Sequence, residues 1–283
     1  MATPAVKECH YRVDAPVLGH FPGAHRSTRG ESGFEFRGHA SLTDAPDARR
    51  LDLHASLRDP FGHWLVRVYS QRKAMPVVMV VDVSASMAFA GQQRKLDVVA
   101  DFTESLAWSA WRTGDSFGFV ACDSVVRADL SQAPTRARGV GAPLAAALRQ
   151  LQPQGRSALG LLHAAAHLGR QRALVFLVSD FHLPLAQVQS LLASLAVHEV
   201  VPVVAWDPQE FTLPTRRGWL QVQDPESGTR RLVWWRPALR ERWLASLAAR
   251  RQALLDVFQA HALKPLFLEG AFDADAVTRH FHT

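Results

Sequence analysis

The sequence predicts an α/β fold, a central and mostly parallel sheet flanked by helices, from two observations. From Pro76 onward, short apolar runs alternate with longer segments of helical periodicity, which is typical of parallel strands joined by crossover helices. The run at residues 77–81 is rich in β-branched side chains, as expected for a central strand buried on both faces. With 283 residues, of which 48% are hydrophobic, the chain is long enough for about two domains and a well-filled core.

The segment before this alternation has a different texture. Residues 1–73 are rich in Gly, His, Arg and Pro and hold only short apolar groups, which predicts loops and a few strands. After the strand at 77–81, a helix is expected at 98–111 because Val99, Phe102 and Leu106 share one helical face. The next expected elements are strands at 117–122 and 125–130, helices at 143–151 and 158–168, a strand at 173–178, a helix at 185–196 and a strand at 199–206.

A β-hairpin and a long helix are expected near the C-terminus. The turn-forming residues 224–228 lie between two strand-like runs, so we expect a hairpin insertion at about 219–235. Pro237 suits the first turn of a following helix. A last strand at 266–268 and a short terminal helix complete the prediction. The side chains expected on the apolar side of the long helix are Trp243, Leu244, Leu247, Leu254 and Phe258.

Composition excludes several classes of protein. Two cysteines, Cys9 and Cys122, cannot build a disulfide scaffold, so a reducing, cytoplasmic compartment is expected. The N-terminus lacks an apolar signal region, and no apolar run approaches the length of a membrane span. The net charge of +6 is spread along the chain without a basic stripe interleaved with aromatic residues, so no nucleic-acid partner is expected.

The motif that carries chemistry is Asp82-Val83-Ser84-Ala85-Ser86, directly after the first parallel strand. Ligands of open α/β sheets bind at the carboxyl ends of the strands, where this loop lies. Its carboxylate and two hydroxyls can converge on one small cation, and such oxygen ligands suit Mg²⁺, Mn²⁺ or Ca²⁺. Asp180, after a later strand, and Ser157, before a helix, could reach the same rim.

This pattern resembles the von Willebrand factor A domain and its metal-ion-dependent adhesion site. Asp82, Ser84 and Ser86 match the Asp-x-Ser-x-Ser loop of that family, and Asp180 matches the Asp after its fourth strand. The family's middle loop supplies a Thr after paired glycines, whereas this chain has Gly155-Arg156-Ser157. An inward Arg156 would lower metal affinity, and an outward one would attract a partner's carboxylate; the sequence does not choose between them.

The chain also resembles the DUF58 family of bacterial A-domain proteins, which are usually paired with MoxR-type AAA+ ATPases. The resemblance implies an N-terminal DUF58-type extension at 1–73 and an A-type domain at 74–283. Leu53 and Leu57 depart from it, standing where the family usually has Trp and Ala. The matching segments are Gly33-Phe34-Glu35-Phe36, residues 49–58, Arg67-Val68-Tyr69, residues 207–210, Leu213-Pro214 and Gly218.

Other sites are weaker. His163 and His167 have the i, i+4 spacing of helical metal ligands, but no Glu follows His163 as in a zincin, so they are expected to face solvent. Cys122 ends a strand and is expected to be a core residue. Phosphatases that begin with Asp after their first strand use a second carboxylate two residues later, where this chain has Ser84.

Together these observations predict a non-enzymatic, metal-dependent protein-interaction module. The resemblance implies a MoxR-type ATPase as partner, with the pair acting like a chaperone in complex maturation or metal insertion. The cation would keep one position open for a Glu or Asp of a client or partner protein. A metal-dependent hydrolase of phosphate esters is the alternative, because a metal can activate water without a side-chain base.

Overall fold

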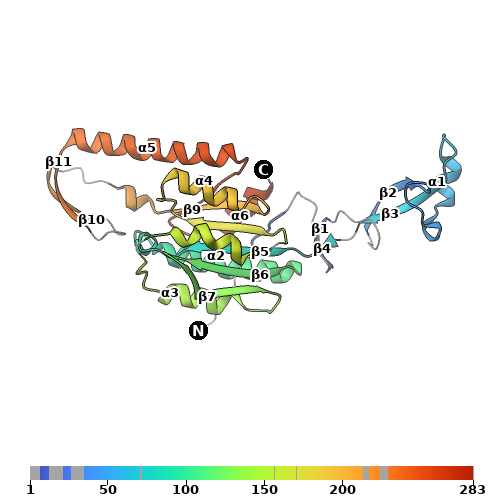
Figure 1. Cartoon of the computed structure of the whole chain (residues 1–283), viewed down its shortest axis with the longest axis horizontal. Helices are drawn as coiled ribbons and strands as arrows, with labels where there is room; N and C mark the ends of the chain where they lie inside the picture. Colours follow the sequence, from blue (N-terminus) through green and yellow to red (C-terminus); the bar gives the residue numbers. More distant parts are fainter. Residues whose placement is uncertain are drawn as a thin grey trace.

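A six-stranded sheet lies at the centre of the computed structural model, which describes residues 7–12, 22–26, 35–70, 72–155, 157–169, 171–212, 217–223 and 229–282. The strand order is β12-β9-β8-β5-β6-β7 (Figure 1). Neighbouring strands run parallel except for β6 and β7, so the predicted mostly parallel sheet is confirmed. The strands are β5 (Pro76–Asp82), β6 (Ser116–Cys122), β7 (Val126–Thr135), β8 (Leu174–Ser179), β9 (Glu199–Trp206) and β12 (Leu266–Glu269).

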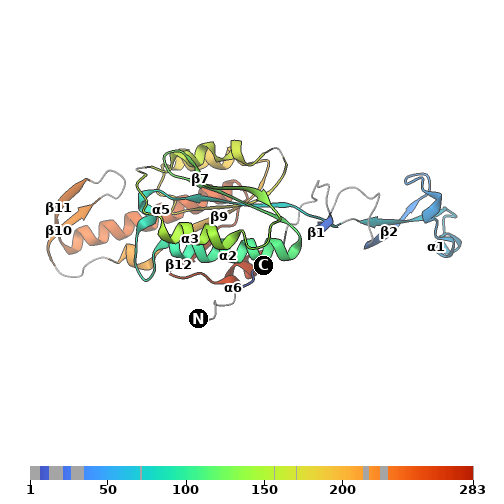
Figure 2. The same ribbon diagram turned by 90° about the horizontal axis from the view of Figure 1, so that it is seen from below.

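Helices cover both faces of this sheet, as Figures 1 and 2 show. One face packs against α2 (Lys95–Thr113), α3 (Gly141–Gln150) and α6 (Ala274–His282). The other packs against η3 (Leu159–His167), α4 (Leu185–Ser194) and the C-terminal end of α5 (Pro237–Ala260). The buried β5 supplies both cores, because Val77 and Met79 point to the first and Val78 and Val80 to the second.

An arm extends from the sheet at the end where β5 begins (Figure 1). It contains β1 (Pro22–Arg26) paired with β4 (Arg72–Lys73), and β2 (Glu35–Ser41) paired with β3 (Leu65–Ser70). Between β2 and β3 lie the short helices η1 (Ala48–Arg50) and α1 (Leu53–Arg58). The expected loops and few strands of this segment are thus observed, and Leu53 and Leu57 are exposed on α1.

Residues 7–12 belong to the packing of the sheet rather than to the arm. The Cys9 N–H donates to Ser109 Oγ of α2 at 3.0 Å, and the Tyr11 hydroxyl donates to Asp115 Oδ2 at 2.7 Å. Cys9 and Tyr11 are buried in the core that lies under α2 and α6.

Two predicted helices differ in part from the prediction. The helix predicted at 158–168 is present as η3, but it is a 3-10 helix. At its start the Gly160 N–H donates to Asp123 O at 2.8 Å, and a Cβ at Gly160 would meet the Val125 backbone. The apolar side of α5 is also shorter than expected: Leu254 and Phe258 are buried, whereas Trp243 and Leu244 are exposed.

The predicted hairpin is observed as β10 (Gly218–Gln223) and β11 (Arg230–Trp235), paired antiparallel. Its turn at 224–228 lies outside the described residues, as do Gly33-Phe34 and Leu213-Pro214. None of the described helices contains an apolar stretch long enough to span a membrane.

Candidate metal centre

Asp82 is the last residue of β5, and its carboxylate is fixed by hydrogen bonds from two loops. Asp82 Oδ1 accepts from the Ser84 N–H at 2.9 Å. Asp82 Oδ2 accepts from the Ser179 hydroxyl at 2.7 Å, at the end of the neighbouring strand β8. Only 1% of Asp82 is exposed. The two strand ends predicted to meet at the rim therefore do meet there.

The motif continues in the short helix η2 (Ala85–Ala88), which turns the backbone away from the strand. The Ser84 and Ser86 hydroxyl oxygens lie 3.3 Å apart, and both side chains are buried. The Ser86 side chain also lies close enough to the Asp180 carboxylate to affect its pKa. Asp180 follows β8 and is 2% exposed. Four of the five predicted ligands, Asp82, Ser84, Ser86 and Asp180, thus form one connected group.

The fifth predicted ligand, Ser157, lies in the loop before η3. This loop touches the motif, because the Ala85 N–H donates to Gly155 O at 2.9 Å. Ser157 itself is half-buried. Arg156, whose direction the sequence left open, lies outside the described residues.

The Asp82 carboxylate has no positively charged partner among the described residues. Within the described part of the chain, no Lys, Arg or His forms an ion pair with its carboxylate. Burial, followed by the negative charge of Asp180, raises the pKa of Asp82 to about 7. A bound cation would remove this penalty. The donor set of carboxylates and hydroxyls fits a hard divalent ion such as Mg²⁺.

Asp180 has a different environment, which sequence analysis missed. The Lys95 ammonium lies 3.3 Å from Asp180 Oδ2 and 2.8 Å from Glu210 Oε2. Lys95 is the first residue of α2, yet only 3% of it is exposed. Glu210 comes from the short helix η4 (Pro208–Phe211) after β9. Nothing in the sequence marks this lysine as buried, whereas Glu210 does lie in one of the segments that resemble the DUF58 family.

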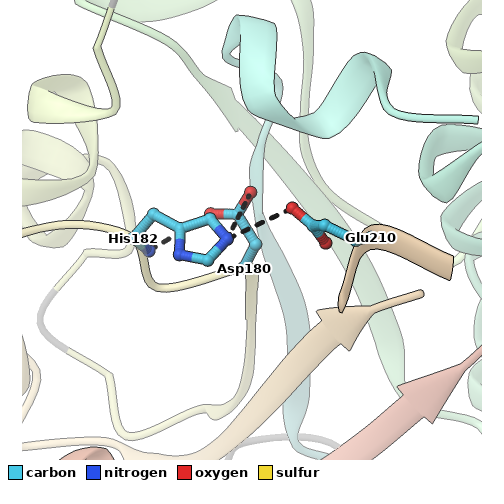
Figure 3. A group of neighbouring side chains, drawn as sticks. All are labelled: Asp180, His182 and Glu210. Atoms are coloured by element: carbon cyan, nitrogen blue, oxygen red, sulfur yellow. Dashed lines mark hydrogen bonds and ion pairs between the residues drawn. The ribbon is translucent and has the colours of Figure 1, made fainter. Parts of the chain in front are cut away.

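His182 completes this second group, which Figure 3 shows together with Asp180 and Glu210. Its Nε2 lies 3.3 Å from Glu210 Oε1 and 4.0 Å from Asp180 Oδ2. Three ligand atoms of these residues lie within 4.8 Å of one another, a spacing that could hold a metal ion. However, the Lys95 ammonium already bridges both carboxylates, so this group is an ion-pair network balanced by the protein's own cations.

The network sets the charge state of its members. Burial alone would raise the pKa of Asp180, but the charges of His182 and Lys95 outweigh it and lower that pKa. Partial burial opposes charge on His182, but its contacts with Glu210 and Asp180 raise its pKa above the ordinary value. Asp180 is therefore ionised beside an Asp82 that is not favoured to ionise without a cation.

The backbone after Asp180 is held in an unusual conformation. Phe181 has φ 52°, a left-handed value that is uncommon for a bulky residue. Arg250 of α5 donates to the carbonyls of Phe181, at 2.7 Å, and Leu183. The Trp206 indole donates to Asp180 O at 2.9 Å. These bonds fix the loop that carries the predicted ligand.

Of the remaining candidates, Cys122 ends β6 beside Asp82, whereas the two histidines lie on η3. His163 and His167 are both exposed on η3, as expected. Cys122 is fully buried, and burial together with the charges of Asp82 and Asp123 raises its pKa to about 12. Its thiol therefore stays protonated, as expected of a core residue.

Comparison with known proteins identifies the family. The model described as "Protein of unknown function DUF58" matches residues 44–253. The chain belongs to the DUF58 family. A relative of this chain is the uncharacterized protein Rv1480 of Mycobacterium tuberculosis, which is 28% identical over an alignment of 227 residues that covers 72% of this chain. The match spans 65% of the length of Rv1480 and of the other mycobacterial relatives.

Two further similarities were found. The "uncharacterized protein in moxR 3′ region" of Paracoccus denitrificans is 36% identical over 103 residues, which is 36% of this DUF58 chain and 97% of that protein. Among solved structures, a von Willebrand factor type A protein from Catenulispora acidiphila is 13% identical and covers 76% of this chain and 42% of its own, with a TM-score of 0.40. The fold described above is assigned from the chain's own strand order and core.

Proposed function

We propose that this DUF58 chain is a non-enzymatic protein-interaction module that works through a bound divalent cation, Mg²⁺ or else Mn²⁺ or Ca²⁺. Asp82, Ser84, Ser86 and Ser157 would hold the ion, and Asp180 would bind it directly or through water. The bound ion would supply an electrophilic centre with one open position for a Glu or Asp of another protein. The observation that carries the proposal is the Asp82 carboxylate, which is 1% exposed, lies at the strand end beside Ser84 and Ser179, and has its pKa raised to about 7 by burial and by the charge of Asp180.

Because of the ion-pair network, the bound cation would be neutralised mainly by one carboxylate, that of Asp82. Lys95 and His182 offset Asp180 and Glu210, so Asp82 is the group of the rim with unbalanced negative charge. A divalent ion held there keeps most of its positive charge for an incoming carboxylate.

The partner in this proposal is a MoxR-type AAA+ ATPase, with the chain as its adaptor in maturing a protein complex or inserting a metal. Support comes from the resemblance to DUF58 proteins and from the Paracoccus relative, whose name places it beside moxR. Because such an ATPase consumes ATP, the proposal places the pair in the cytoplasm.

The domain division is part of the same proposal. The arm within residues 1–73 would form one unit and residues 74–283 the metal-binding unit, onto which residues 7–12 pack back. The hairpin at 219–235 is an insertion in the second unit.

Metal binding is tested by replacing two buried carboxylates at strand ends, Asp82 and Asp123, each with Asn. Calorimetric titration with Mg²⁺ and Mn²⁺ is expected to show one site in the wild type and none in Asp82→Asn. The control is Asp123→Asn: Asp123 follows β6, is 6% exposed and is already paired with Arg127 at 3.1 Å, so this variant should keep the site.

Partner binding is tested by passing a purified MoxR-type ATPase over immobilised DUF58 chain. The ATPase should be retained in the presence of Mg²⁺. Retention should be lost when EDTA removes the ion and when Asp82→Asn replaces the wild-type chain. Undiminished retention in EDTA would refute metal-dependent binding.

A further inference from the structure

The β10–β11 hairpin has one face that the rest of the described chain leaves uncovered. The ladder pairs Trp219 with Trp234 and Gln221 with Leu232 on this outer face. Trp219 is 67% exposed, Leu232 65% and Trp234 50%. Large apolar side chains at such exposure in one patch mark an interaction site more often than an ordinary surface.

The opposite face of the hairpin packs against α5, which leaves the outer face directed toward solvent. Leu220 and Val233 are half-buried, and Trp235 is only 3% exposed. Trp235 lies edge-on to Trp243 of α5, with ring centroids 6.5 Å apart. The outer pair, Trp219 and Trp234, is also edge-to-face at 5.3 Å. The two outer rings are therefore held in place before any partner arrives, which reduces the entropy cost of binding.

Arginine is frequent in the sequence of the hairpin and of the residues that flank it. Residues 216–243 contain seven arginines and three acidic residues, a surplus of 7 − 3 = 4 out of the chain's net +6. Arg217, Arg231 and Arg236 are exposed and have no carboxylate partner in the described part of the chain. An open depression of about 410 Å³ is lined by Arg217, Trp234, Arg236, Pro237 and Ala238.

The hairpin lies at the same end of the molecule as the candidate metal centre. The chain enters β5 from the arm and leaves β9 toward η4 and β10, so the carboxyl ends of the parallel strands face the hairpin (Figure 1). The arm lies at the opposite end. A protein bound at the metal would therefore approach from the side of the hairpin.

We propose that the outer face of the β10–β11 hairpin docks an acidic segment of a partner protein that carries large apolar side chains. The apolar side chains would pack on Trp219, Leu232 and Trp234, and the carboxylates would pair with Arg217 and Arg236 at the depression. Trp and Arg are the residue types that contribute most to protein interfaces. Arginine also binds carboxylates with two parallel hydrogen bonds.

The surface favours a protein segment over a nucleic acid. Single-stranded nucleic acids need a continuous basic groove with ring faces open to stacking bases. Here Trp219 and Trp234 stand edge-to-face, with aliphatic Leu232 beside them. In the sequence, acidic residues also fall between the arginines.

This docking surface goes beyond the proposed metal-dependent function, because it uses none of the predicted metal ligands. Binding at the hairpin should persist in EDTA and in Asp82→Asn. Failure of the metal site and failure of the hairpin can thus be told apart.

The probe is a fluorescein-labelled synthetic peptide in which Glu and Asp alternate with Leu and Phe, followed by fluorescence anisotropy with the full chain in EDTA. Trp219→Ala/Trp234→Ala and Arg217→Glu/Arg236→Glu are each expected to weaken binding by ~10-fold or more. The matched control is Trp64→Ala, because Trp64 is 56% exposed on the distant arm and should not matter. Circular dichroism melting verifies that each variant folds.

Several outcomes would overturn the proposal. These are equal binding by all variants, no peptide binding, and equal binding of a peptide with Lys in place of Glu and Asp. Tighter binding of a single-stranded oligonucleotide would assign the surface to nucleic acid instead. A dimer in sedimentation velocity that Trp219→Ala/Trp234→Ala dissociates would assign it to a second copy of the chain.

Discussion

Replacing Asp82 by Asn is expected to stabilise the metal-free protein at pH 8, although Asp82 is fully buried and hydrogen-bonded. The unfolded chain holds this carboxyl at a pKa near 3.8, and the folded protein raises it to about 7. Above pH 7 the folded state must therefore carry an ionised group that it disfavours by about 4 kcal/mol, at about 1.4 kcal/mol per pKa unit. The carboxamide removes that penalty.

The substitution also has a cost. The Asn side chain keeps one acceptor, so one of the two bonds, from the Ser84 N–H or from the Ser179 hydroxyl, is lost or weakened. A hydrogen bond to a charged group contributes about 1.5–3 kcal/mol. The expected net gain for Asp82→Asn in EDTA is therefore about 1–2 kcal/mol at pH 8.

The sign of the pH dependence follows from the raised pKa. The folded state binds the proton more tightly than the unfolded state, so wild-type stability is greatest below about pH 4 with respect to this group and falls as pH rises to 7. At pH 5 the folded carboxyl is protonated but the unfolded one is still mostly ionised, so about 1–2 kcal/mol of the penalty remains. The gain of Asp82→Asn should therefore shrink to about zero at pH 5, because the lost hydrogen bond then offsets it.

Urea unfolding in EDTA at pH 5 and pH 8, with Asp123→Asn as control, measures these differences. Adding Mg²⁺ should stabilise the wild type and Asp123→Asn but leave Asp82→Asn unchanged. A variant that is less stable than the wild type by the same amount at both pH values would refute the reasoning, because Asp82 would then carry no charge penalty.

Three further predictions concern the surroundings of the site. Lys95→Met should cost about 3–5 kcal/mol in urea unfolding, because it leaves Asp180 and Glu210 without their shared cation; a cost below about 1 kcal/mol would show that the network is not buried in solution. Gly160→Ala should lower the free energy of unfolding by about 1–3 kcal/mol, since the added Cβ would lie 2.5 Å from backbone atoms of the β6–β7 turn. Urea unfolding tests this as well, and an unchanged stability would contradict the close approach. Glu210→Gln should lower the NMR titration midpoint of His182, which in the wild type should exceed its ordinary value; an unmoved midpoint would show that Glu210 does not raise it.

The sequence sufficed for the sheet because each strand has a local signal. The run at 77–81 is buried at both faces of β5, and Glu199–Trp206 was predicted with the bounds that the structure shows. The side chains at the strand ends were predictable for the same reason: parallel strands end at one edge, so Asp82 and Asp180 had to approach each other.

Tertiary contacts explain what the sequence could not supply. Lys95 looks like an ordinary solvated residue at a helix start, and only the fold brings two carboxylates to its ammonium. The contact of Gly160 with the β6–β7 turn joins residues far apart in the sequence, so helical periodicity could not predict it. Trp243 fits the apolar side of α5, but the helix extends past the sheet before reaching Leu254.

The sequence also could not show which arginines lie close together in the fold. Counted along the chain, the arginines are spread thinly, and no basic stripe was predicted. Antiparallel pairing places the start of β10 beside the end of β11, so the flanking Arg217 and Arg236 lie at the same end of the hairpin. Both line one depression together with Trp234. This surface combines residues from two strands, so it could be recognised only once the pairing of the strands was known.

The two proposed contacts are joined by a single helix. α5 begins directly after the hairpin, and farther along it Arg250 donates to the carbonyls of Phe181 and Leu183, just after Asp180. Near its start, Trp243 of α5 packs edge-on against Trp235 of the hairpin. α5 therefore contacts both the hairpin and the loop that follows Asp180.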